Sequence, residues 1–331
     1  MKSFYSMGLC LTAALLMAAS VPAITLSNGP DMAPARVSPV QDSHPRELMQ
    51  EDTFDAGAGG NLHVDVYDAD VEVVTGAAGG ATVQIYLRSN DMDWARGIFA
   101  EMEISARRDG SSVIIETTKK PSSSWWNNTG NRWFNVIARV QIPEEFDLDI
   151  STGDGDVSVD NLRGRASIQT ADGDISVTRL DGPAIILQTS DGDIEANSLT
   201  ADRIEIDTSY GDIDIGSLSG PVTGKTSDGD IQVKLAAASE ARFQTGDGDV
   251  RVELSQAAPL NISTGDGDID IVVPGSLAAD VDLRGEDVEL MGGLAIEGSV
   301  RDGRAQGRIN GGGPLIKAET GDGEIRLVTR N

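Results

Sequence analysis

A repeat of 18 or 19 residues constrains the fold of this 331-residue chain more than any other feature. Each copy is marked by an Ile or Val directly after Gly-Asp, at Val157, Ile175, Ile194, Ile213, Ile231, Val250 and Ile269. A degenerate copy follows at Val288 and a clean one at Ile325, 37 residues further. One unit this short cannot bury its apolar face alone, so the repeat predicts a stack of similar units.

Each repeat combines two strand patterns with a corner between them. Apolar residues stand nine and seven residues before the marker Ile or Val, and again at the marker and two residues after it. This alternation is typical of β-strands, and the change of parity between the two pairs places a corner at Asp-Gly-Asp. Gly accepts positive φ, and Asp bonds nearby backbone N–H groups.

We therefore predict an all-β fold, a single-stranded parallel β-solenoid over residues 147–331, irregular at 276–312. The general preference for right-handed crossovers predicts a right-handed coil. A β-sandwich of repeated hairpins is the alternative. We also expect an open strand edge after the last coil, with Arg326 and Arg330 guarding against end-to-end self-association.

Stacking would align the acidic side chains of successive corners in two columns, three residues and one residue before the marker. The −3 column contains Asp154, Asp172, Asp191, Asp228, Asp247, Asp266 and Asp322, with Tyr210 in one coil. The −1 column contains Asp156, Asp174, Asp193, Asp212, Asp230, Asp249, Asp268, Asp287 of the degenerate copy and finally Glu324.

Like charges one strand apart repel by roughly 1 kcal/mol in water, so these columns need an offsetting interaction. One explanation is local: the carboxylates accept corner amides, and a Thr five residues before the marker joins the network. The other is a row of Ca²⁺ ions, which prefer oxygen ligands. The candidate ligands are the Asp pairs of the six coils that carry both columns. No other cofactor is expected.

The N-terminal residues predict that the protein is exported. Lys2, the apolar run at 7–19 and a small-residue site at 21–23 indicate a signal peptide over 1–23. The single cysteine, Cys10, lies within it. Residues 24–53 predict a flexible, Pro-rich tether. We therefore expect an exported protein of a Gram-negative periplasm or cell surface, with no membrane span in the mature chain.

The net charge of −27 excludes nucleic acids and anionic membranes as partners. Both are negatively charged and are bound by proteins through clustered Lys and Arg, whereas this chain would be repelled. The two histidines, His44 and His63, have no nucleophile motif nearby, and the repeated carboxylates mark no single place for catalysis. We therefore predict that the chain is not an enzyme. A polysaccharide-active β-helix enzyme is one alternative, and a Ca²⁺-organised binding module is another.

Residues 54–146 predict a β-rich N-terminal module that leads into the coils. Asp68-Ala69-Asp70 resembles the later corners, and Asp109-Gly110 predicts a hairpin turn. Trp125 and Trp126 stand in a Ser/Asn-rich loop, where an exposed pair could contact a sugar or a protein. The alternative is that the tryptophans fold back over the open end of the solenoid.

These features together resemble the bacterial "putative adhesin" family, a domain of unknown function with β-strand repeats. The resemblance covers roughly residues 54–329 and is carried by the repeated Thr-x-Asp-Gly-Asp-Ile and by 64–73, 140–143, 147–150, 309–314 and 325–327. It implies a non-catalytic, cell-envelope β-solenoid. We therefore predict an adhesin-like structural or interaction module whose partner is a cell-envelope protein or polysaccharide.

Overall fold

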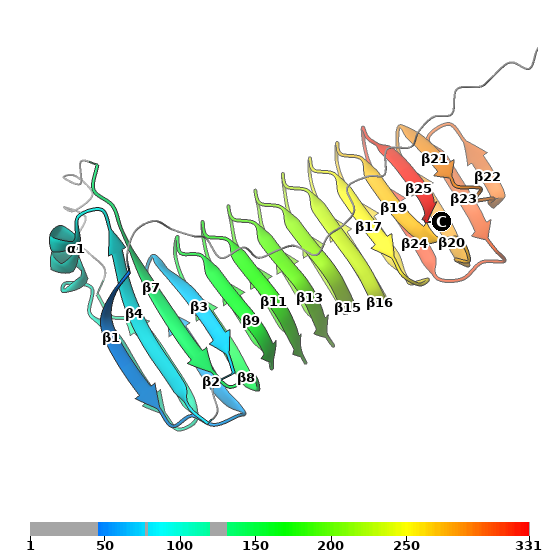
Figure 1. Cartoon of the computed structure of the whole chain (residues 1–331). Helices are drawn as coiled ribbons and strands as arrows, with labels where there is room; N and C mark the ends of the chain where they lie inside the picture. The colour runs from blue at the N-terminus through cyan, green and yellow to red at the C-terminus, as the bar shows by residue number, and fades with distance from the viewer. Residues whose placement is uncertain (1–45, 77–78, 120–130, 331) are drawn as a thin grey trace, which may run out of the picture. The chain divides into compact units, whose positions relative to one another are not determined.

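The computed structural model describes residues 46–76, 79–119 and 131–330, all within the larger of the chain's two units, Pro34–Asn331. These residues form 25 strands and one helix, α1 (Met92–Phe99). The prediction of an all-β chain with a solenoid-like stack of coils is confirmed, although the sheet is mixed because antiparallel strands join it at both ends (Figure 1).

Two ladders of strands run along the stack, and each coil supplies one strand to each ladder. The first ladder consists of β8 (Phe146–Ser151), β10 (Ala166–Gln169), β12 (Ile185–Gln188), β14 (Ile204–Asp207), the second halves of β15 (Ile213–Lys225) and β16 (Ile231–Gln244), and β18 (Leu260–Ser263). The second consists of β9 (Val157–Arg163), β11 (Ile175–Gly182), β13 (Ile194–Ala201), the first halves of β15 and β16, β17 (Val250–Leu254) and β19 (Ile269–Pro274). All these pairs are parallel, and most equivalent positions of the repeat pair directly.

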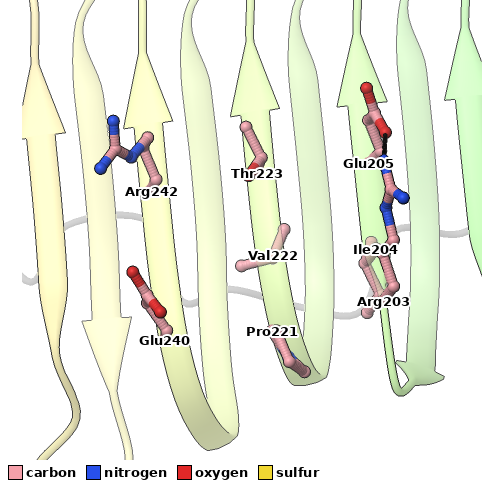
Figure 2. Close-up of a pocket in the computed structure, with 8 residues that line it drawn as sticks. All are labelled: Arg203, Ile204, Glu205, Pro221, Val222, Thr223, Glu240 and Arg242. Carbon is pink, nitrogen blue, oxygen red and sulfur yellow. Dashed lines mark hydrogen bonds and ion pairs between the residues drawn. The ribbon is translucent and has the colours of Figure 1, made fainter.

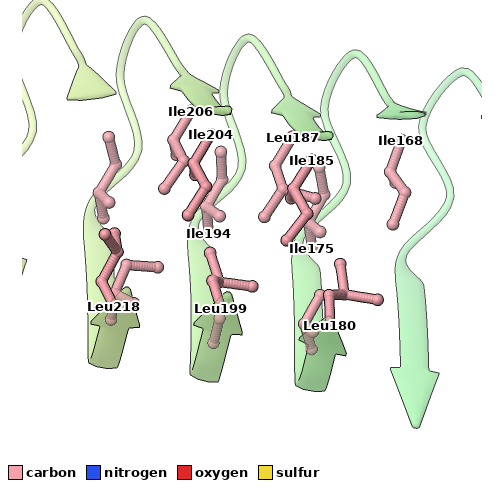
Figure 3. Close-up of a cluster of buried hydrophobic side chains, with 14 of the residues drawn as sticks. Ile168, Ile175, Leu180, Ile185, Leu187, Ile194, Leu199, Ile204, Ile206 and Leu218 are labelled. Atoms are coloured by element: carbon pink, nitrogen blue, oxygen red, sulfur yellow. The ribbon is translucent and has the colours of Figure 1, made fainter. Parts of the chain in front are cut away.

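The core lies between the two ladders. Figure 3 shows how Ile175 and Leu180 from β11 meet Ile185 and Leu187 from β12 inside the stack. These four side chains are completely buried. Burial of one such aliphatic side chain contributes about 1.5–3 kcal/mol, so the alternation read from the sequence also supplies the main stabilising term.

The N-terminal module continues both ladders before it caps them. β2 (Gly60–Asp65) pairs with β8 and β3 (Ala69–Thr75) with β9, so the corner at Asp68-Ala69-Asp70 is part of the stack. Farther out lie β6 (Ser112–Thr117) and β7 (Phe134–Ile142), also parallel. The end is covered by the antiparallel strands β1 (Glu47–Phe54), β4 (Ala81–Ser89) and β5 (Ile104–Asp109).

Two features of this module differ from the sequence prediction. The tether predicted for residues 24–53 ends earlier, because residues 47–53 belong to β1, which pairs with β4. Helix α1 was not predicted. Its Asp91 cap accepts a hydrogen bond from the Trp94 amide, and Ala95 and Ile98 are buried against the core.

The C-terminal coils do not follow one another in chain order. β24 (Leu315–Glu319) and β25 (Glu324–Arg330) lie between the coil of β18 and β19 and the coil of β20 (Ala279–Arg284) and β21 (Asp287–Met291). Ile269 therefore pairs with Ile325, and Ile325 pairs with Val288. The expected open edge after the last coil is wrong, since β25 has a partner on each side.

The end of the stack is instead formed by the irregular segment. β22 (Glu297–Arg301) and β23 (Arg304–Ile309) extend the sheet from β20 in antiparallel order. Arg326 guards no edge: its guanidinium lies 3.0 Å from an oxygen of Asp268 and 2.6 Å from one of Glu324. Arg330 forms an ion pair with Glu253.

Close approach of the coils, not positive φ, explains the glycine in each Asp-Gly-Asp corner. The glycines of positive φ do not include Gly192, Gly211 or Gly229, so the conformational reason given from sequence is wrong. A Cβ on Gly211 would overlap the Gly192 carbonyl of the preceding coil. The same holds for Gly323 above Gly267. Because Glu286 stands where the degenerate copy needs glycine, the copy with Gly323 is the one that can stack on Gly267.

We expect Gly211→Ala to lower the free energy of unfolding by about 1–3 kcal/mol, because the added methyl group forces two coils apart. The measurement is chemical denaturation followed by circular dichroism. Gly275→Ala is the matched control, since a Cβ there meets no atom within 4 Å. Equal stability of the two variants would contradict the close-approach explanation.

Candidate functional site

The −1 column is a continuous chain of hydrogen bonds between coils. The amide of Asp174 donates to Asp156 Oδ1 at 3.0 Å, and the amide of Asp193 donates to Asp174 Oδ1 at 2.9 Å. The same bond recurs at Asp212, Asp230, Asp249 and Asp268. The chain of bonds begins at the carboxylate of Asp70 in the first corner and ends at the amide of Glu324 in the last. Each carboxylate thus satisfies a backbone donor of the next coil, which is the local explanation considered from sequence.

The −3 column makes no comparable bonds. Asp154, Asp172, Asp191, Asp228, Asp247 and Asp266 are all exposed. Within the residues that the structure describes, no three His, Cys, Asp or Glu side chains are grouped so that they could hold a metal ion. The Ca²⁺ ladder therefore stays a prediction, whereas the hydrogen bonds already give half of its carboxylates a structural role.

The threonine of each corner completes the network from inside. Thr208 Oγ1 donates to the Gly192 carbonyl at 3.1 Å and accepts from the Gly211 amide at 3.3 Å. Equivalent bonds are made by Thr170, Thr189, Thr226, Thr245, Thr264 and Thr320. Every one of these threonines is buried, so the hydroxyl is the internal partner of groups that water cannot reach.

We expect Thr208→Val to cost about 1–3 kcal/mol of stability, because it leaves the buried Gly211 amide and Gly192 carbonyl without this partner. Thermal and urea unfolding would measure the loss. Thr178→Val, at a partly exposed strand position, is the control and should change stability little. A neutral Thr208→Val variant would show that the hydroxyl is dispensable.

Acidic side chains also gather on the outer surface beside the −1 column. Burial raises the pKa of Glu195 above its ordinary value, and the neighbouring Asp214, Asp193 and Asp174 raise it further. Burial likewise raises the pKa of Asp214, against the opposing effect of a hydrogen bond from Gln232. This surface therefore holds protons more tightly in the folded chain than in the unfolded one.

The consequence for pH follows from linkage. A carboxyl whose pKa is raised by folding makes the folded state take up protons as the pH falls toward the ordinary carboxyl range, so stability increases in that interval. We therefore expect the melting temperature to rise as the pH is lowered from 7 to about 5. Glu195→Gln/Asp214→Asn should raise it at pH 7 and flatten the dependence.

The control for that experiment is Asp154→Asn/Asp172→Asn, which removes two charges from the −3 column. If it flattens the pH dependence equally, net charge and not the Glu195–Asp214 pair is responsible. A melting temperature that falls on acidification to about pH 5 would contradict the direction itself.

The predicted tryptophan pair, Trp125 and Trp126, lies outside the described residues. Next to that segment, the Asn90 side chain donates to the Asn131 carbonyl at 2.8 Å and accepts from the Trp133 amide at 3.0 Å. Trp94 on α1 packs edge-to-face on Phe134, with ring centroids 5.8 Å apart. This packing of Trp94 does not test the expectation for Trp125 and Trp126.

His63 is paired, but not in a catalytic arrangement. Its Nδ1 lies 2.9 Å from Asp149 Oδ2 on the neighbouring strand, and both side chains are exposed. Among the described residues, no Ser or Thr hydroxyl is hydrogen-bonded to this imidazole. The pair supplies two members of a hydrolytic triad without its nucleophile.

A groove lies on the outer face of the first ladder. It has a volume of about 300 Å³ and crosses three coils, from β14 through β15 to β16 (Figure 2). Glu205, Thr223 and Arg242 lie side by side across these strands. The short side chains of Pro221 and Thr223 form the middle, between charged side chains on either side. Sequence reasoning missed this groove because these residues break no repeat rule.

The charges along the groove alternate. Arg203 and Glu205 form an ion pair of 2.7 Å on one side, while Glu240 and Arg242 stand on the other. The two sides are two strand spacings apart, or about 10 Å. The four charges sum to zero, so the groove offers donors and acceptors without favouring an anion or a cation. On the same coil as β14, Tyr210 replaces the −3 aspartate and is 64% exposed.

Comparison with known proteins places these features in context. A family model described as Toastrack DUF4097 matches residues 53–282. No curated protein matches the chain. No helix among the described residues has the length and apolar character needed to cross a membrane.

Solved structures similar to this chain include the following three. A "putative adhesin" from Bacteroides fragilis NCTC 9343 has 13% identity and a TM-score of 0.43, covering 68% of this chain and 97% of that one. A "putative adhesin" from Parabacteroides merdae ATCC 43184 has 9% identity and a TM-score of 0.48, covering 85% and 96%. A "putative lipid binding protein" from Parabacteroides distasonis ATCC 8503 has 16% identity and a TM-score of 0.43, covering 84% and 96%.

Proposed function

This chain belongs to the Toastrack DUF4097 family, and we propose that it is an exported, non-catalytic, adhesin-like module that binds a neutral polysaccharide of the cell envelope. The membership confirms the resemblance to a domain of unknown function read from the sequence. Export rests on the signal peptide predicted for residues 1–23. The single-stranded parallel solenoid serves here as a rigid acidic support for the groove.

The charge-neutral groove carries this proposal. A guanidinium donates hydrogen bonds and a carboxylate accepts them, and sugar hydroxyls do both. Because Arg203, Glu205, Glu240 and Arg242 balance one another, a hydroxyl-rich neutral chain fits better than a charged one. The net charge of −27 further disfavours acidic polymers.

Tyr210 supports the same ligand class. It is the aromatic break in a column of aspartates, and its ring is exposed on the coil that forms one side of the groove. An exposed aromatic ring can stack on the apolar face of a sugar. Contact of Trp125 and Trp126 with an envelope partner stays a prediction. So do the Ca²⁺-organised module and the polysaccharide-active enzyme.

We expect Arg242→Ala and Tyr210→Ala each to weaken polysaccharide binding about tenfold, the loss of one charged hydrogen bond or one stacking contact. Calorimetric titration with a panel of neutral and acidic polysaccharides would measure it. Arg165→Ala, an exposed arginine beside the same ladder, is the matched control. Binding of acidic polymers alone, or equal binding by all variants, would contradict the proposal.

A further inference from the structure

The strand β22 is an unpaired edge at the end of the stack. Its partner is β23, and its other side meets no strand within the described residues (Figure 1). All five of its residues are exposed, and Val300 keeps 53% of its surface in solvent. Exposed edges of this kind are templates for pairing with another strand.

Three arginines stand in a row across the sheet at this edge, and their like charges repel one another. Arg284, Arg304 and Arg301 lie directly opposite one another on β20, β23 and β22. Asp282 lies 3.1 Å from the first and 3.6 Å from the second. Arg301 has no ion pair within the described part of the chain. Like charges directly opposite each other destabilise a sheet, so a carboxylate beyond Arg301 would be favourable.

The hairpin geometry determines which backbone groups are free. β22 and β23 are joined by the two-residue turn Asp302-Gly303, which places Arg301 and Arg304 in a hydrogen-bonded pair. Alternation along the strand then leaves the N–H and C=O groups of Gly298 and Val300 pointing away from β23. A second strand can therefore pair with exactly these residues.

We propose that two copies of this chain associate through β22, in antiparallel order about a two-fold axis at Ser299. In this register Gly298 exchanges backbone hydrogen bonds with the partner's Val300, and Val300 with the partner's Gly298. Glu297 faces the partner's Arg301, so each copy supplies the carboxylate that the other's arginine row lacks. Gly298 has no side chain, which leaves room for the partner's Val300.

Two of the other open edges, β1 and β21, lack this self-complementarity. The described strands with a partner on one side only are β1, β5, β21 and β22. β1 carries Glu47, Glu51 and Asp52, and β21 carries Asp287 and Glu289. Pairing either acidic edge with itself, or β1 with β21, would bring like charges together. The charges thus disfavour these pairings, and pairing of β22 with its own copy gives a closed dimer.

The contact is small. Two five-residue strands bury less than the roughly 1,200 Å² of a standard interface, so we expect a reversible dimer with a micromolar dissociation constant. Sedimentation equilibrium of the full chain over a range of concentrations measures it without any ligand, so the result is independent of the polysaccharide proposal.

Charge reversal tests the register. We expect Glu297→Arg and Arg301→Glu each to weaken the dimer more than tenfold, because each makes both cross-strand pairs repulsive. A mixture of the two variants should form a heterodimer, since every facing pair is then opposite in charge. The double variant Glu297→Arg/Arg301→Glu should dimerise like the wild type. These rescues also show that the variants fold.

Glu289→Arg on β21 is the matched control, a charge reversal on the other open edge at the same end, and should leave the dimer unchanged. A wild-type chain that stays monomeric near millimolar concentration would overturn the proposal. So would a dimer that resists both single reversals, a mixture that fails to associate, or growth into filaments.

Discussion

The hydrogen bond from one corner to the next is the interaction on which this structure depends. The threonine hydroxyl, the glycine carbonyl and the aspartate carboxylate each join neighbouring coils, and they do so at strand spacing only because the glycine has no side chain. Residues 147–275 hold 25 acidic and 8 basic residues, a balance of −17. Much of the acidity is therefore a consequence of corner chemistry.

Because the corners and the buried aliphatic columns hold the register, the outward positions are free to vary. The features proposed for binding are all outward: Tyr210 in the aspartate column, the short Pro221 and Thr223 between charged neighbours, and the irregular β22. A solenoid can thus change its ligand without changing its core, since each outward side chain contacts few others.

At both ends of the stack the coils leave chain order. At one end β2 and β3 lie inside β6 and β7, which come later in the chain. At the other, β24 and β25 lie inside β20 and β21, which come earlier. At the C-terminal end the coil with the regular Gly323 corner is next to the regular stack, and antiparallel strands lie beyond the irregular coil. The degenerate coil, in which Glu286 takes the glycine position, lies outside the coil of Gly323.

The sequence by itself determined the repeat, the strands, the corners and the inward residues, because these follow from the alternation of side chains and from local turn chemistry. It also named the alternative in which carboxylates bond corner amides. Tertiary structure alone decided the order of the last coils, the helix and the groove. Each depends on contacts between residues far apart in the chain, such as Gly323 above Gly267 and Glu205 beside Thr223. The periodicity of the sequence does not indicate which distant coil each coil will pack against.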